Sequence, residues 1–372
     1  MVGRFGKEEL EAVESVIRSG RLSSFYRNPD GGEMVRRFEE EFAEYLGVEY
    51  AVSFNSGTSA LFASIKALGL GEGDVVLVPA LTFVSTATAP LMAGCRVRFV
   101  DVDDTLCMDP ASVEERVDGA SAVMPVHLLG CPADMDEIKR VASEEGLPVI
   151  EDACQALGGR YKFRKLGTMG DVGVFSFQET KTITTLGEGG MAVTNEEWLA
   201  NRLRMIRNHG EKYYRSLIMG YNFRMTEAQA AFGLAQLRRL DYFNQLQRSN
   251  AEDFREMLPS KLRPVRVRDY CVYHIIATYV EDDRLLGRRG LVVRELEEKG
   301  VSKGVPGDNV SLGYTAPLYD DVPLLGAFKE PCPRAEWYTQ RMLWFDIHRW
   351  KTYKEFKEVM SKVLEVLWRE FA

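Results

Sequence analysis

The sequence predicts an α/β fold in which a mostly parallel sheet of seven strands lies between layers of helices. Seven short apolar runs are typical of buried strands, and they span residues 50–54, 75–79, 96–100, 121–126, 148–151, 172–177 and 190–194. Helical periods lie between several of them, at 58–69, 83–93, 134–145 and 196–206. Because parallel strands need long crossover connections, this alternation favours a parallel sheet with both faces covered.

Two helices are expected before the first strand. Residues 7–20 have an amphipathic pattern that ends at Gly20, and a second helical pattern over residues 34–46 is stopped by Gly47. A turn-rich segment, Asn28-Pro29-Asp30-Gly31-Gly32, separates the two. This N-terminal arm therefore precedes the alternating part of the chain.

A change of pattern after the last predicted strand indicates a second, smaller domain. Residues 226–258 form a long helical stretch that could bridge two domains. Beyond it we expect a strand at 271–277, a helix at 289–299 and a terminal amphipathic helix at 352–371, a mixture typical of an α+β domain. We therefore expect an N-terminal arm and large domain over residues 1–245 and a small α+β domain over residues 246–372.

The bulk composition excludes several classes of protein. The 372 residues carry a net charge of −8 without a long basic run, which argues against nucleic acid as the main partner. No apolar stretch approaches the ~20 residues of a membrane span, and the N-terminus lacks the apolar region of a signal peptide. The six cysteines show no CxxC spacing, which favours buried thiols in a reducing compartment. We expect a soluble, cytoplasmic protein.

An ordered set of polar residues at or after the ends of two predicted strands indicates the chemistry. Asp152 ends one strand, Ser176 ends another, and Lys181 precedes the glycine-rich turn Gly187-Glu188-Gly189-Gly190. Pyridoxal phosphate needs an anion at its ring nitrogen, donors at its phosphate and one amine that reacts with its aldehyde. A buried Asp152 would pair with the protonated ring nitrogen, although alone it is equally typical of a helix cap. The sequence therefore predicts a pyridoxal phosphate site in which Lys181 and Asp152 are the catalytic residues.

Further residues extend this predicted site. The segment Asn55-Ser56-Gly57-Thr58 follows a strand and opens a helix, which suits either phosphate binding or ordinary capping. Phe83 could lie against a planar cofactor or fill the core, and Gln155 could bond to the ring hydroxyl. The run Gly69–Gly73 ends a helix instead of opening one, so we reject nicotinamide binding. Without an HxH or HExxH spacing we assign no metal.

Taken together, the sequence resembles the DegT/DnrJ/EryC1/StrS family of pyridoxal-phosphate sugar aminotransferases, which have the aspartate-aminotransferase-like type I fold. Several segments carry this resemblance in the expected order: Phe38-Glu39-Glu40-Glu41-Phe42, Asn55-Ser56-Gly57-Thr58, Pro125-Val126-His127, Glu151-Asp152-Ala153, Gly187-Glu188-Gly189-Gly190, Arg207-Asn208-His209-Gly210 and Gly220-Tyr221-Asn222-Phe223-Arg224. The likeness covers residues 7–245 well and the remainder loosely.

The resemblance implies a role for each candidate residue. Gly57, Thr58 and Ser176 would hold the phosphate, and Phe83 would stack on the ring. The remaining roles fall to Asp152 at the ring nitrogen, Gln155 at the ring hydroxyl and Lys181 at the aldehyde. Asn222 would reach the phosphate of the neighbouring subunit, although from one sequence it is nearly as typical of a turn. The resemblance thus implies a homodimer with shared active sites.

The implied activity is transfer of an amino group from glutamate or glutamine to a keto-sugar or to a keto-cyclitol. We expect the keto-sugar to be nucleotide-linked. Gly31-Gly32-Glu33-Met34-Val35 is similar to the cyclitol and aminoshikimate branch of the family. One alternative is a dehydratase or an aromatising enzyme related to aminohydroxybenzoate synthases. The family's dehydratases carry histidine at the position of Lys181, which disfavours that alternative. The other alternative is a cofactor-binding regulatory protein, for which the sequence shows no DNA-binding helix pair or basic face.

Overall fold

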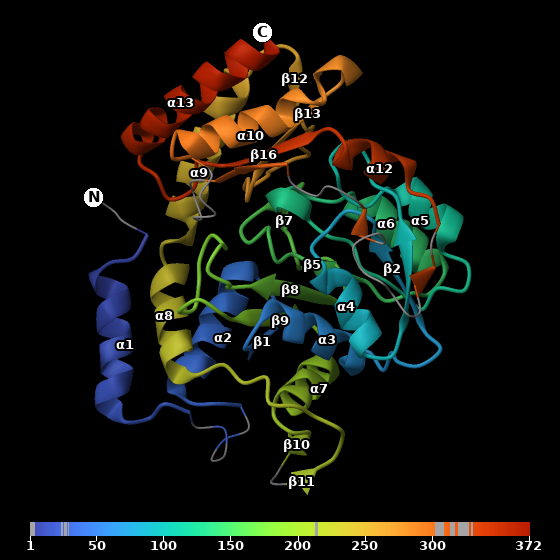
Figure 1. The fold of residues 1–372 in the computed structure, drawn as a ribbon. Coiled ribbons are helices and arrows are strands. Elements are labelled where there is room, and N and C mark those ends of the chain that lie inside the picture. The colour runs from blue at the N-terminus through green and yellow to red at the C-terminus, as the bar shows by residue number, and fades with distance from the viewer. Residues whose placement is uncertain are drawn as a thin grey trace.

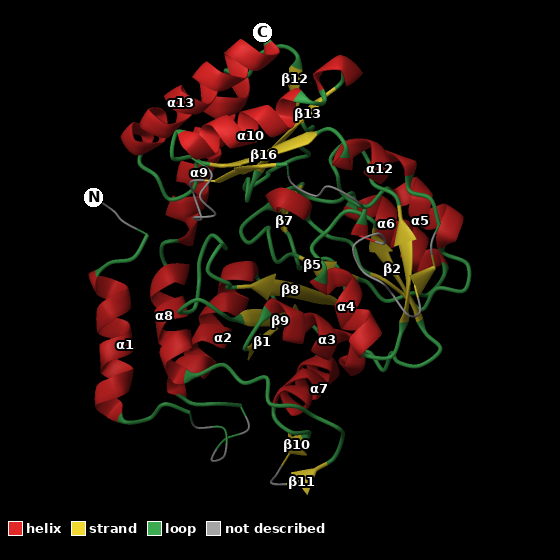
Figure 2. Ribbon diagram, viewed as in Figure 1, coloured by secondary structure: helices red, strands yellow, loops and turns green. Residues whose placement is uncertain are grey.

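A computed structural model describes residues 4–23, 25, 28, 30–212, 215–301, 309–312, 317–318, 327–328 and 330–372 of the chain. A twisted sheet runs through the larger part of the molecule, with helices on both sides, and a second sheet with its own helices lies above it (Figures 1 and 2). Each sheet has its own buried apolar cluster. A further cluster lies between the central sheet and the helices near the N-terminus.

The central sheet confirms the predicted mostly parallel arrangement. Its strands are β1 (Tyr50–Phe54), β2 (Val75–Pro79), β3 (Arg96–Val100), β4 (Ala122–Val123), β5 (Ile150–Asp152), β8 (Val172–Ser176), β9 (Gly190–Thr194) and β15 (Ala327–Phe328). The order is β1-β9-β8-β5 in one half and β4-β2-β3-β15 in the other, and parallel bridges from Val123 to Val149 and from Val126 to Asp152 join the halves. Six of the seven predicted strands run in one direction, and β9 runs opposite to them between β1 and β8.

The helices of the larger part follow the predicted periods, except α5, which was not predicted. They are α1 (Lys7–Ser19), α2 (Glu33–Leu46), α3 (Gly57–Ala67), α4 (Ser85–Met92), α5 (Pro110–Arg116), α6 (Met135–Glu144), α7 (Glu197–Arg207), α8 (Glu227–Leu237) and α9 (Leu240–Glu256). In α2, Val35, Phe38 and Phe42 are buried at helical spacing against Phe175 and Phe177 of the sheet region. The stretch predicted as one helix over 226–258 is two helices, α8 and α9, and α1 lies alongside α8 (Figure 1).

The C-terminal part contains an antiparallel sheet in the order β12-β13-β16-β14. These strands are β12 (Leu262–Pro264), β13 (Ile276–Val280), β14 (Asn309–Ser311) and β16 (Met342–Asp346). The helices α10 (Arg288–Glu298) and α13 (Tyr353–Phe371) pack together beside this sheet, and α12 (Pro333–Thr339) lies near the edge of the central sheet (Figure 1). The strand β15 crosses back to pair with β3. The domain boundary at residues 245/246 stays a prediction.

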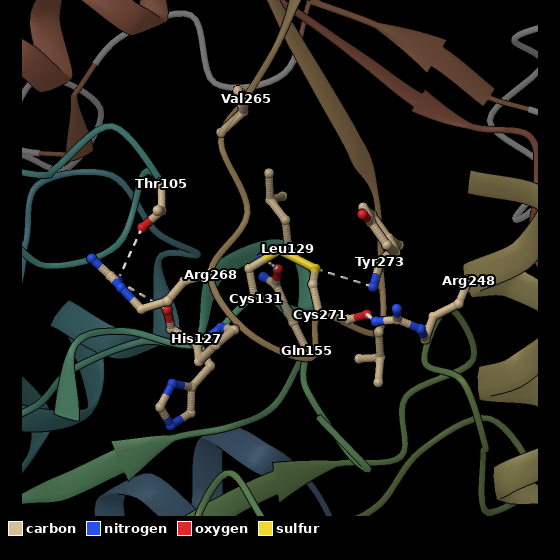
Figure 3. Close-up of a disulfide and its surroundings, with 12 residues drawn as sticks. Thr105, His127, Leu129, Cys131, Gln155, Arg248, Val265, Arg268, Cys271 and Tyr273 are labelled. Carbon is tan, nitrogen blue, oxygen red and sulfur yellow. Dashed lines mark hydrogen bonds between the residues drawn. A yellow bond between two sulfur atoms is a disulfide. The ribbon is translucent and has the colours of Figure 1, made fainter. Parts of the chain in front are cut away.

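The prediction of a strand at 271–277 is wrong for residues 271–275. Only Ile276 and Ala277 belong to β13, which continues to Val280. Residues 271–275 form a loop, because Val272 N and His274 N donate to Gly130 O and Leu129 O instead of a sheet partner, and Tyr273 has a positive φ of 51°. The apolar run is therefore buried by packing against the 128–131 segment (Figure 3).

The expectation of six free thiols is also wrong, because Cys131 and Cys271 form a disulfide (Figure 3). No local pattern points to this bond, since 140 residues separate its two cysteines. Cys95, Cys107 and Cys332 are buried thiols as expected, and Cys154 is half-buried. The disulfide joins the 271–275 loop to the segment that follows β4.

Among the described residues, no helix combines the length and the apolar character needed to cross a bilayer.

Opening this disulfide should lower the free energy of unfolding by about 2–5 kcal/mol, because the bond closes a long loop in the unfolded chain. The measurement is urea denaturation of the Cys131→Ala/Cys271→Ala protein, with Cys95→Ala as the control for loss of a buried sulfur. Alkylation of the unfolded, unreduced wild-type protein should label the four remaining cysteines. Labelling of all six would contradict the disulfide.

Candidate active site

A cleft of about 600 Å³ lies where the carboxyl ends of the central strands meet the C-terminal sheet. Seven of the eight predicted site residues line it: Gly57, Thr58, Phe83, Asp152, Gln155, Ser176 and Lys181. Asn222 is exposed and does not line the cleft of its own chain. Residues from five separate segments therefore converge, as expected where parallel strands end at one edge of a sheet.

The start of α3 forms a cradle for an anion. Ser56 caps the helix, and its Oγ accepts a hydrogen bond from Ser59 N at 3.1 Å. Gly57 faces Ser176, and a Cβ at this position would lie 3.0 Å from Ser176 Cβ, so a larger residue would crowd Ser176. Thr58 Oγ1 bonds to Ser85 Oγ at 2.8 Å. Two hydroxyls and a helix N-terminus thus face one space, the arrangement that phosphate groups favour.

Asp152 ends β5 and is only 5% exposed. Its Oδ2 accepts a hydrogen bond from Thr86 Oγ1 at 2.8 Å, and its Oδ1 accepts one from Cys154 N at 3.1 Å. No ion pair joins it to a lysine, arginine or histidine of the described chain. A buried carboxylate without a cation is costly, so this site calls for a cationic group from a ligand.

Gln155 has one end of its amide fixed. Its Oε1 accepts a hydrogen bond from Leu129 N at 2.8 Å, and Figure 3 shows the side chain beside the segment of the disulfide. The NH2 group is thereby left to donate to an acceptor in the cleft. Phe83 comes just before α4 and is 57% exposed, so its ring borders the cleft instead of filling the core.

Lys181 lies in the loop between β8 and β9. Burial lowers the pKa of its amine, and the nearby Arg349 lowers it further, whereas Cys154 and Asp152 act in the opposite direction. The backbone of the loop is held from outside: Arg4 Nη2 donates to Lys181 O at 2.9 Å and to Glu179 O, and Arg349 Nη1 donates to Thr180 O. The backbone at Lys181 is thus held in place, and burial makes its amine lose a proton more readily than an exposed lysine does.

Sequence reasoning missed the residues that the C-terminal part contributes. His274, Ile275 and Trp344 line the cleft, and Arg349 lies behind His274. His274 stood inside an apolar run that we interpreted as a strand, so its polar side chain attracted no notice. The buried His127 has a structural role. Its Nε2 bonds to Glu151 at 2.8 Å, and Glu151 also accepts hydrogen bonds from the backbone of residues 167–170. No cluster of three or more metal-ligating side chains occurs in the described ranges.

The cleft fits pyridoxal phosphate. The unpaired Asp152 suits a protonated pyridine nitrogen, the α3 cradle suits a phosphate, and Gln155 offers donors to a ring hydroxyl. Lys181 supplies an amine within the same cleft. This donor set on a mostly parallel sheet defines the class of pyridoxal-phosphate-dependent transferases of fold type I.

The comparison with protein families narrows this class. The model of the DegT/DnrJ/EryC1/StrS aminotransferase family matches residues 4–364, so the chain belongs to that family. The match extends through the C-terminal part, where the sequence alone showed only a loose likeness.

Individual relatives agree with this membership. The chain is 39% identical over 299 residues to an L-glutamine:2-deoxy-scyllo-inosose aminotransferase of Streptoalloteichus tenebrarius, which covers 75% of this chain and 70% of the relative. It is 36% identical over 326 residues to a GDP-perosamine synthase of Escherichia coli O157:H7, with 85% of both chains covered. Among solved structures, an E. coli GDP-4-keto-6-deoxy-D-mannose-3-dehydratase with bound hydrated PLP is 27% identical, with a TM-score of 0.87 over 98% of this chain and 97% of that one.

Asp152→Asn should reduce kcat by roughly 10²-fold or more, because the amide cannot hold a proton on the ring nitrogen electrostatically. The apoprotein should remain as stable as the wild type, since the substitution removes a buried charge and keeps the shape. Steady-state kinetics and thermal unfolding check these outcomes. Thr86→Val, which leaves the charge in place, is the matched control and should keep most of the turnover. A near-normal kcat for Asp152→Asn would remove this carboxylate from the chemistry.

Proposed function

We propose that this protein is a pyridoxal-phosphate-dependent aminotransferase that moves an amino group from glutamate or glutamine to a keto-sugar or a keto-cyclitol. The observation that carries the proposal is the meeting of Lys181, the unpaired Asp152 and the α3 cradle in one cleft. The names of the relatives support the substrate class, since one acts on an inosose and another makes a GDP-linked amino sugar.

Each residue has a defined task in this reaction. Pyridoxal phosphate supplies an aldehyde that takes up the amino group and a cationic ring that holds the electrons released at the α-carbon. Asp152 keeps the ring nitrogen protonated, while Gly57, Thr58 and Ser176 bind the phosphate and Phe83 covers one face of the ring. The NH2 group of Gln155 donates to the ring hydroxyl.

Lys181 moves the proton. Its Nζ, in the neutral form that burial promotes by lowering the pKa, takes a proton from the α-carbon of the amino donor, which leaves as a 2-oxo acid. In the second half-reaction Nζ returns a proton to the carbon that entered as a ketone. The sum is amino acid plus ketone giving 2-oxo acid plus amine, so neither an oxidant nor a metal is required.

The two alternatives fit less well. A dehydratase of this family would carry histidine where this chain has Lys181, although a dehydratase is among the similar structures. A regulatory protein that only binds the cofactor does not need a lysine whose amine has a lowered pKa, as Lys181 has. Cofactor binding without turnover would favour the regulatory alternative.

The visible absorption spectrum tests the function. The purified protein with pyridoxal phosphate should be yellow, and either L-glutamate or L-glutamine should shift the band to that of the aminated cofactor. Addition of the matching keto-sugar or keto-cyclitol should reverse the shift. Lys181→Ala is the control that should show neither the band nor the shift. A wild-type protein that takes up no pyridoxal phosphate would contradict the proposal.

The proposed enzyme is a homodimer that works in the cytoplasm. Its exposed Asn222 lies outside the cleft of its own chain, which supports the proposed contact with the phosphate in the partner. Leu217 and Met219 in the same segment are 58% and 80% exposed, as expected of a surface that a partner covers. The cytoplasmic location follows from the substrates, since activated sugars and amino acids are metabolites of that compartment.

Hybrid dimers test the shared site. Lys181→Ala and Asn222→Asp should each abolish most activity alone, the second because a carboxylate repels the phosphate. After the two proteins are mixed and exchanged, half of the dimers carry one intact site, so activity should recover to about a quarter of the wild-type value. Cofactor content and light scattering confirm the exchange. If mixing restores nothing, Asn222 does not act across the dimer.

A further inference from the structure

His274 faces the cleft from the loop that leads into β13. It is 5% exposed and lines the cleft together with Lys181 and Trp344. It also lines a small void beside Cys154, Ser176 and Lys181. His274 and Lys181 therefore line both spaces, and the charge of Lys181 acts on the pKa of the imidazole.

Arg349 fixes the proton on this imidazole. Its Nη1 lies 3.1 Å from His274 Nδ1, and a guanidinium can only donate, so Nδ1 must be the accepting nitrogen. The proton of the neutral ring therefore sits on Nε2. Without Arg349, the imidazole of His274 could carry its proton on either nitrogen.

Hydrogen bonds hold the side chain of Arg349 in place. It is 1% exposed, and its Nε donates to Asp346 Oδ1 at 2.5 Å while Nη2 donates to Asp346 Oδ2. Its Nη1 also donates to Thr180 O, next to Lys181. The guanidinium is thus tied to β16, to the lysine loop and to His274 at the same time.

The Nε2–H group of His274 is left for a ligand. Arg349 is the only hydrogen-bond partner of this imidazole in the described part of the chain, and it uses Nδ1. The ring stays neutral because burial lowers its pKa well below the usual value, and the positive charges of Lys181 and Arg349 and the neighbouring His348 lower it further. Cys154 faces the ring across the void, and Asp346 lies behind Arg349. With Nδ1 bonded to Arg349, Nε2–H is the donor that this imidazole can offer to the cleft that His274 lines.

We infer that His274 donates its Nε2–H to an oxygen of the substrate bound beside Lys181, and that Arg349 is the positioning residue that fixes this tautomer. The inference rests on the proposed function. The oxygen belongs either to the carboxylate of the amino donor or to a carbonyl or hydroxyl of the ketone acceptor, and both accept a hydrogen bond in the same way.

Nitrogen NMR tests the tautomer without any turnover. The chain has only four histidines, so histidine-selective ¹⁵N labelling gives a simple spectrum, and loss of one signal set in His274→Gln assigns the ring. We expect a pyridine-type Nδ1 and a pyrrole-type Nε2 from about pH 6 to 8, the range in which an ordinary histidine titrates. In Arg349→Met the two forms should mix, and the ring should titrate at a higher pH than in the wild type, because a donor and a positive charge are gone. An unchanged tautomer in Arg349→Met would overturn the positioning role.

Kinetics test the ligand. His274→Leu should raise KM for one substrate about tenfold with a smaller change in kcat, the size expected for one lost hydrogen bond. His274→Gln keeps an N–H donor and should recover most of this loss. A raised KM for the amino acid identifies the carboxylate, and a raised KM for the ketone identifies the acceptor.

The outcomes separate this inference from the proposed function. If the wild type transfers amino groups but His274→Leu leaves both KM values unchanged, the inference is wrong and the function stands. If the wild type transfers none, the function is wrong, and the NMR result still decides the role of Arg349.

Discussion

The active site depends most on one buried carboxylate that forms no ion pair with the described residues. Asp152 sits at the end of β5, where Thr86 and the backbone of Cys154 supply hydrogen bonds but no positive charge. Such a group is unfavourable in an empty interior and favourable only beside a cationic ligand. The surrounding architecture serves this requirement, since the parallel strands deliver a phosphate cradle, an amide donor and an amine to the same edge of the sheet.

The amine is positioned by residues from both ends of the chain. Arg4 and Arg349 donate to the carbonyl groups of residues 179–181, so the N-terminal arm and the segment after β16 hold the loop of Lys181 together. Arg349 also contacts His274. The second sheet is therefore part of the active site, because it supplies the groups that fix the lysine and close the cleft.

The sequence predicted the central sheet and its polar residues well, and the reason is local. Each of the seven strands is an apolar run bounded by turns or helices. Asp152 and Ser176 end two of these strands, and Lys181 follows the second. Residues that act through tertiary contacts carry no local sign. The disulfide joins two cysteines 140 residues apart, and His274 is hidden in an apolar run whose first half is a loop pinned to residues 129–130. The strand β15 escaped prediction because only its pairing with β3 makes it a strand.

The most direct measurement identifies the lysine that carries the cofactor. The protein loaded with pyridoxal phosphate is reduced with borohydride, which makes the attachment permanent, and is then digested and mapped by mass spectrometry. The label should appear on the peptide that contains Lys181 and on no other of the chain's lysines. A label on a different lysine, or one scattered over several surface lysines, would contradict the assignment of this cleft as the active site.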